Sequence, residues 1–192
     1  NINTRTGKNI ATVSASIVNN YKDDINNLLI IGRIPSKGMI NSDDELINNT
    51  INTELVKAIS TSGLLSKVYY SPLSDCSIDD NSWVENPENI SEMKSFKIEL
   101  DDSNMSHGEK LSFETNFFLP ESLRLNQNGY MLYTAYYNYN NEQCKEDFVI
   151  NIRTEQGTIS EQDCQTKDEI VVNKANGNKI VLGTRATVSG ID

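Results

Sequence analysis

Histidine and cysteine, the side chains used most often in nucleophilic catalysis and metal binding, are scarce in this chain of 192 residues. It has one histidine, His107, in a segment typical of a surface turn, Asn104-Met-Ser-His-Gly108. A Ser–His–Asp or Cys–His mechanism would have to use that residue. No Cys-x-x-Cys pair or histidine-rich cluster is present for zinc, and no glycine-rich loop for phosphate. We therefore expect a protein that is not an enzyme, with no metal site and no cofactor.

Basic charge and long apolar runs are also in short supply. The chain has 17 lysines and arginines against 27 aspartates and glutamates, a net charge of −10. The basic residues are scattered singly, and a nucleic-acid partner is not expected because binding phosphates needs a basic face. The longest apolar run, near Leu28–Ile31, falls far short of the roughly 20 residues that a membrane span needs. We expect no membrane span in this segment.

The three cysteines are Cys76, Cys144 and Cys164, and no pair has metal-ligand spacing. In an oxidising compartment Cys144 and Cys164 are candidates for a disulfide, because both lie in polar segments that follow neighbouring predicted strands. Cys76 would then be free or available to another chain.

Alternation of apolar and polar residues predicts about nine short strands. Asparagine is abundant, and it favours turns between strands. Asn176-Gly177 is a strong hairpin signal between the last two strands. The predicted strands are Ile10–Val18, Leu28–Ile34, Lys67–Ser71, Phe96–Leu100, Leu111–Leu119, Tyr130–Tyr139, Lys145–Arg153, Ile170–Asn173 and Lys179–Ser189.

One short segment, Thr53–Ser60, has near-helical apolar spacing and a threonine that could cap a helix. With so little helix, the natural fold is an all-β, antiparallel, immunoglobulin-like sandwich with at most one short helix. We expect residues 1–153 to form this domain. Residues 154–192 are expected to be a polar connector and a hairpin that completes the sandwich or starts a following module. The chain itself is expected to be a piece of a longer protein.

Aromatic side chains are the candidate ligand contacts. Five tyrosines lie in the strand Tyr130–Tyr139, and Trp83 interrupts the long polar loop before it. Exposed tyrosine can stack on a sugar or anchor a partner protein, so we take Tyr133, Tyr136, Tyr137 and Trp83 as candidates. The alternative is that these rings pack in the core. The acidic runs Asp43–Glu45 and Asp79–Asn81 are better explained as solvated loops than as calcium ligands.

An internal amide cross-link is a further possibility. A buried lysine can attack an asparagine side chain when a protonated carboxyl group polarises the amide in an apolar environment. Lys8 near the first strand, with Asn151 or Asn173 on late strands, would have a suitable topology. The carboxylates that can be placed, Glu99 and Glu114, alternate to the outer face.

Several segments together resemble the DUF11-like repeat domains of Gram-positive surface proteins. The opening segments are Val13-Ser-Ala-Ser-Ile-Val-Asn19 and Leu29-Ile-Ile-Gly-Arg-Ile-Pro35. The later ones are Val68-Tyr-Tyr-Ser71, Met93-Lys-Ser-Phe-Lys-Ile98, Gly108-Glu109, Leu111-Ser-Phe-Glu114 and Phe118-Leu-Pro120. The similarity covers roughly residues 9–153, whereas the insertion at 36–66 and the polar segment after 153 depart from the family pattern.

The resemblance implies an extracellular module of a large protein of the bacterial cell surface or wall, usually repeated in tandem. Its expected function is a non-enzymatic stalk, spacer or adhesive domain, and its expected partners are neighbouring modules or identical subunits. Two alternatives stay open. One is a subunit of a self-assembling fibre or pilus that exchanges strands. The other is a module that binds a glycan, or a host or matrix protein, through exposed tyrosines and long loops.

Overall fold

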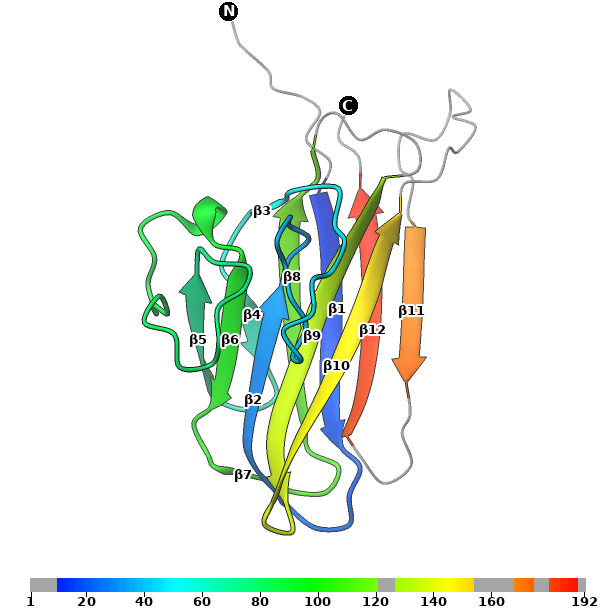
Figure 1. Cartoon of the computed structure of the whole chain (residues 1–192). Coiled ribbons are helices and arrows are strands. Elements are labelled where there is room, and N and C mark those ends of the chain that lie inside the picture. Colours follow the sequence, from blue (N-terminus) through cyan, green and yellow to red (C-terminus); the bar gives the residue numbers. More distant parts are fainter. Residues whose placement is uncertain (1–9, 121–126, 154–167, 175–179, 190–192) are drawn as a thin grey trace, which may run out of the picture.

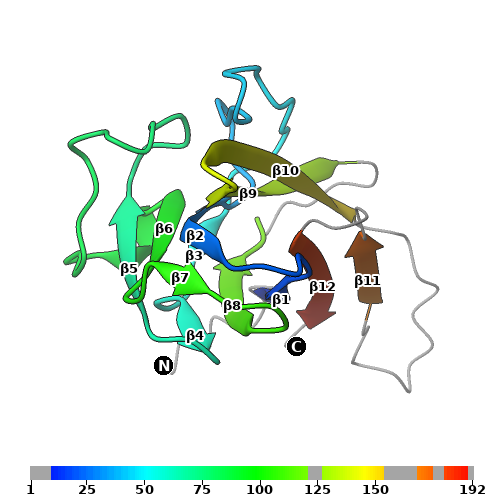
Figure 2. The ribbon, with the colours of Figure 1, turned by 90° about the horizontal axis from the view of Figure 1, so that it is seen from below.

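The computed structural model describes residues 10–120, 127–153, 168–174 and 180–189. These residues form an all-β sandwich of two antiparallel sheets (Figures 1 and 2). One 3-10 turn, Ile90–Glu92, is the only helical element of the described residues. They contain no helix that is long and apolar enough to cross a membrane. The strands are β1 (Ile10–Asn19), β2 (Ile25–Arg33), β3 (Glu54–Leu55), β4 (Ser60–Ser62), β5 (Ser66–Ser71), β6 (Ser95–Leu100), β7 (Asn104–Met105), β8 (Lys110–Phe118), β9 (Asn128–Tyr139), β10 (Glu142–Arg153), β11 (Asp168–Lys174) and β12 (Ile180–Ser189).

The first sheet, here the β1 sheet, has the order β11-β12-β1-β8-β3, with β4 also paired to β8. The second, the β2 sheet, has the order β10-β9-β2-β6-β5, with β7 also paired to β2. The chain crosses from one sheet to the other six times along the described strands: between β1 and β2, β2 and β3, β4 and β5, β7 and β8, β8 and β9, and β10 and β11. Figure 2, seen from below, shows the two layers edge-on. The β11–β12 hairpin belongs to the β1 sheet, because β12 pairs with β1 along its whole length.

The predicted helical turns over Thr53–Ser60 are wrong. The segment is extended: β3 pairs with the end of β8, and the Val56 N–H donates to the carbonyl oxygen of Asn116. The Thr53 hydroxyl donates to the carbonyl oxygen of Pro35 instead of capping a helix. Pairing with β8 buries Leu55 between the sheets, and this tertiary contact overrides the local spacing.

The core lies between the sheets and follows the period of two that β-strands impose. Three rings meet edge-to-face at its centre: Phe96 of β6, Phe113 of β8 and Tyr133 of β9, with centroids 5.1 to 6.4 Å apart. Gly32 of β2 pairs with Phe96 on one side and Tyr133 on the other. A Cβ atom at Gly32 would lie 2.0 Å from Cζ of Phe96, so the ring occupies the space that a side chain would need.

Two buried tyrosine hydroxyls add polar contacts in the core. The hydroxyl of Tyr133 lies 3.2 Å from Oγ1 of Thr115 on the opposite sheet, and that of Tyr137 lies 3.2 Å from the hydroxyl of Tyr21. Burial raises the pKa of Tyr133 and of Tyr137 above the ordinary tyrosine value.

Alkaline unfolding should follow from these two tyrosines. Their pKa values are raised in the folded state, so their contribution to stability is complete below pH of about 10 and is lost as pH rises further. We expect tyrosinate absorbance to rise in a normal titration of exposed tyrosines, followed by a cooperative step that coincides with loss of circular dichroism. Tyr133→Phe should lower stability at neutral pH by about 1 kcal/mol and move the cooperative step to higher pH. A single gradual titration of all tyrosines without unfolding would contradict this.

The described chain enters and leaves the sandwich at the same end. Ile10, the first residue of β1, pairs with Ser189, the last residue of β12. At the opposite end, buried Asn19 ties two turns together: its Nδ2 donates to the carbonyl oxygens of Asp23 and Met105, and its Oδ1 accepts from Tyr21 N–H. This end, at the bottom of Figure 1, is referred to below as the turn end.

Candidate functional site

The outer face of the β2 sheet carries the features of most interest. The segment between β2 and β3 crosses this face in front of β9 (Figure 1). It buries Met39 together with Ile31 of β2 and Leu132 of β9, so that a small third layer lies outside the sandwich. The Asn49 side chain holds the segment to β9: Oδ1 accepts from the Tyr130 N–H at 2.6 Å, and Nδ2 donates to the Tyr130 carbonyl oxygen at 3.3 Å.

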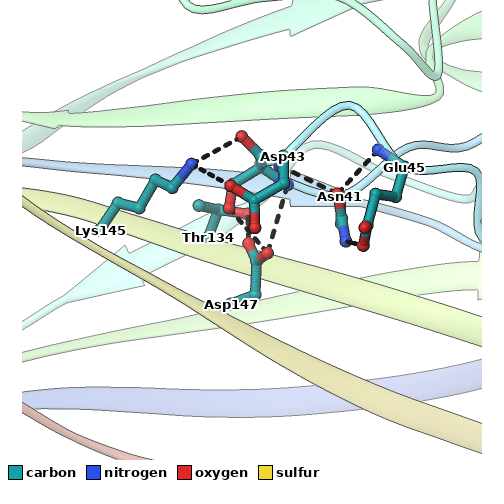
Figure 3. Close-up of polar contacts among 7 residues, drawn as sticks. Asn41, Asp43, Glu45, Thr134, Lys145 and Asp147 are labelled. Atoms are coloured by element: carbon teal, nitrogen blue, oxygen red, sulfur yellow. Dashed lines mark hydrogen bonds and ion pairs between the residues drawn. The ribbon is translucent and has the colours of Figure 1, made fainter.

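Asp147 of β10 fastens the acidic part of this segment to the sheet (Figure 3). Its Oδ2 accepts from Oγ of Ser42 at 2.7 Å and from the Ser42 N–H at 3.2 Å, and its Oδ1 accepts from Oγ1 of Thr134 at 2.6 Å. Lys145 Nζ lies 2.6 Å from Oδ1 of Asp43 and 3.0 Å from the Ser42 carbonyl oxygen. The hydrogen bond to Asp43 raises the pKa of Lys145.

The acidic run itself is organised as a turn around Asn41. Oδ1 of Asn41 accepts from the N–H groups of Asp43 and Glu45, both at 2.9 Å, and Asp44 has a positive φ of 61°. Nδ2 of Asn41 donates to the Glu45 carboxylate. Among the described residues, no group of three or more His, Cys, Asp or Glu side chains is arranged to hold a metal ion.

Removing the Asp147 carboxylate should release this segment. In Asp147→Ala the hydroxyls of Ser42 and Thr134 lose a charged acceptor, at a cost of about 1–3 kcal/mol. We expect amide hydrogen exchange to accelerate over residues 39–47 while β1 and β8 keep their protection. Lys145→Ala is the control, since its ion pair is exposed to solvent and should change stability little. Equal exchange rates in Asp147→Ala and the unmodified protein would contradict the assignment.

A polar hollow of about 630 Å³ opens at the turn end of the same sheet. Its lining comes from four strands and the turns that join them, and every lining side chain is an uncharged amide or hydroxyl. The lining residues are Asn26, Asn27, Ser103, Asn104, Asn138, Asn141 and Gln143.

Irregular backbone shapes this hollow. The β9–β10 hairpin turns through Asn140 and Asn141, with φ of 50° and 61°. Asparagine tolerates this left-handed region better than most residues. Asn27 also has a positive φ, at the irregularity that interrupts pairing of β2 with β9, and its N–H donates to the Ser103 carbonyl oxygen at 2.7 Å. The asparagine-rich composition therefore supplies both the turns and the lining.

The four aromatic candidates occupy different environments. Tyr133 and Tyr137 are core residues, 0% and 3% exposed. They alternate along β9 with the same inward-facing period as Met131. The expectation that they contact a ligand is therefore corrected. Tyr136 is half-buried on the outer face. Burial, and next the Asp147 carboxylate, raise its pKa. Trp83 is half-buried and donates from Nε1 to the Ser77 carbonyl oxygen at 2.9 Å, with Lys97 over its ring.

The cross-link candidates are only partly within the described residues. Cys144 is half-buried on β10, whereas Cys164 lies outside the described residues. Lys8 lies outside them too, and Asn173 is placed only as a backbone position paired with Gly183. Asn151 is half-buried, on the opposite face of β10 from the core residues Ile150 and Ile152, and its Oδ1 is buried with no hydrogen-bond partner among the described residues.

His107 and Arg33 have structural contacts. His107 Nδ1 lies 2.5 Å from the Tyr21 carbonyl oxygen at the turn end. Arg33 is 5% exposed, and its guanidinium donates to Ser74 and Cys76 carbonyl oxygens, to Sγ of Cys76 and to Oγ of Ser95. A single arginine inside the apolar run before Pro35 was the sequence signal for this contact.

No protein-family model, no curated protein and no solved structure matches this chain.

Proposed function

We propose that this chain is a non-enzymatic adhesive module of a bacterial surface protein, and that it binds its partner at the turn end of the sandwich. The observation that carries the proposal is the separation of the two ends. The chain enters and leaves beside Ile10 and Ser189, whereas the polar hollow opens at the other end of the β2 sheet. The ten residues of β1 hold these ends apart by roughly 30 Å, at about 3.4 Å for each residue.

The pairing of β1 with β12 favours an adhesive module over an in-line spacer. A pull applied at Ile10 and Ser189 would act on neighbouring ends of two antiparallel strands. Their hydrogen bonds would then break one after another, whereas a spacer under tension is better served by strands pulled from opposite ends. The resemblance to surface repeat domains supports the cellular location.

Strand exchange in a fibre receives less support. The last described strand, β12, is paired on one side with β1 and on the other with β11 of the same chain. Removing β12 from the sheet would break the backbone hydrogen bonds that it makes with both β1 and β11.

Anchoring the chain in two orientations tests the proposal. One sample carries biotin at its amino terminus. The other carries it on an azide-bearing residue at Glu142, beside the hollow. Each is held on streptavidin and offered collagen, fibronectin and a panel of host and bacterial glycans. We expect binding to at least one member in the first orientation and loss of that binding in the second.

Two results would contradict the proposal. Absence of binding in the first orientation would remove the adhesive role. Equal binding in both orientations would place the contact surface away from the turn end.

A further inference from the structure

The amide side chains of the hollow form a row across the β2 sheet. Gln143 of β10 pairs with Asn138 of β9, Asn138 pairs with Asn26 of β2, and Asn26 pairs with Asn104 of β7. Residues that pair directly point to the same face of a sheet. Neighbouring strands lie about 4.8 Å apart, so one amide follows another at that interval. This spacing is comparable with the length of one pyranose unit.

Three of these amides are free to bind a ligand. Within the part of the chain that the structure describes, the side chains of Asn26, Asn138 and Gln143 make no hydrogen bond. Their neighbours on the same face are engaged: the Thr134 hydroxyl and the Asp147 carboxylate bond to each other. The hollow is thus lined by side-chain donors and acceptors that make no hydrogen bond within the described protein, whereas the adjacent polar side chains on this face are hydrogen-bonded.

The chemistry of the row matches neutral sugars. Each primary amide offers two N–H donors and one carbonyl acceptor, and neighbouring hydroxyls of a sugar ring both donate and accept. No lining side chain carries charge, while the protein as a whole has a net charge of −10. An anionic glycan would meet repulsion from that charge without a cationic partner in the hollow.

One aromatic residue lies on the same face of the β2 sheet as the row. Tyr136 lies two residues before Asn138 on β9, on the same face, and it pairs with Lys145 beside the Gln143 position. Tyr136 is half-buried, so part of the residue is accessible to solvent. Aromatic faces pack against the C–H face of a sugar while the hydroxyls bond to polar neighbours.

We propose that this hollow binds a neutral oligosaccharide, which crosses the strands along the amide row and packs one sugar against Tyr136. The inference rests on the proposed adhesive function and names its ligand class. The volume of about 630 Å³ lies within the range of roughly 300–1,000 Å³ that ligand sites occupy.

Titration of isotope-labelled protein with defined oligosaccharides tests the inference. The neutral probes are chitotetraose, maltotetraose and lacto-N-neotetraose, and the anionic probe is a heparin tetrasaccharide. We expect amide shifts at residues 26, 138 and 143 with at least one neutral probe, nearly independent of salt, and none with heparin.

The variants Asn138→Ala and Gln143→Ala should each weaken binding by about tenfold. Tyr136→Ala should abolish detectable binding, and Tyr136→Phe should retain it. Asn27 and Asn141 are left unchanged because alanine would be strained at their positive φ values. Asn81→Ala, an exposed asparagine in the loop after β5, is the matched control and should bind normally.

The outcomes separate this inference from the proposed function. Binding of collagen or fibronectin at the turn end without binding of any neutral sugar would overturn the inference and leave the adhesive function standing. Absence of all binding would overturn both. Sugar binding unaffected by Asn138→Ala and Gln143→Ala, or binding of the heparin probe, would also overturn the inference.

Discussion

Gly32→Ala should destabilise the protein by about 3 kcal/mol. The added Cβ would lie 2.0 Å from Cζ of Phe96 and 2.4 Å from its Cε1, and that ring is held by Phe113 and Tyr133. The sign is informative, since an unstrained glycine-to-alanine change stabilises by roughly 0.4–1 kcal/mol. Urea unfolding should show a lower midpoint with an unchanged slope.

Shortening the obstructing side chain provides the control. In the Gly32→Ala background, Phe96→Leu should cost much less than it does alone, because the smaller side chain makes room for the new methyl group. The resulting coupling energy should be about 1–3 kcal/mol. Additive effects of the two changes would show that the ring and the glycine do not compete for the same space.

Arg33→Met should lower the free energy of unfolding by about 2–4 kcal/mol. We expect this loss even though the change removes a buried charge. The guanidinium donates to the carbonyl oxygens of Ser74 and Cys76 and to Oγ of Ser95. Those acceptors lose their partner, and the loop that follows β5 loses its attachment to the outer face. Cys76 is 1% exposed, so its thiol should become reactive toward a disulfide reagent only when this loop is released.

Peptide mapping of the labelled thiols gives the measurement. Cys76 should be labelled slowly in the unmodified protein and much faster in Arg33→Met, while labelling of half-buried Cys144 stays the same. Arg33→Lys should resemble Arg33→Met, because a single ammonium group cannot span separated acceptors as a planar guanidinium does. Protection of Cys76 in both variants would contradict this role for Arg33.

The strands could be predicted from the sequence because each has one face in the core. The alternation of Leu111, Phe113 and Phe117 defines β8 without ambiguity. The tyrosines of β9 were harder to assign, because Leu132 on its outer face is also buried. The segment that covers Leu132 is distant in sequence. The alternation of residues within β9 therefore could not show that Tyr133 and Tyr137 face the core and that Tyr136 faces outward.

The candidate site was not predictable for a related reason. The hollow combines Asn26, Asn104, Asn138 and Gln143, which are separated in the chain and share no motif. Only the register of four strands brings them into one row. The attachment of the acidic run to Asp147 likewise depends on a contact between residues 105 positions apart.

Because Ile10 pairs with Ser189, the order of the strands along the chain can be circularly permuted. Directly paired residues of antiparallel strands have Cα atoms about 5 Å apart, so a short linker can join β12 to β1 without disturbing either sheet. A circular permutant joined there and opened in the loop after β5 would keep both sheets and the amide row intact. The fold therefore does not require the chain to begin at β1, because the same strand pairings can form when the termini lie in the loop after β5.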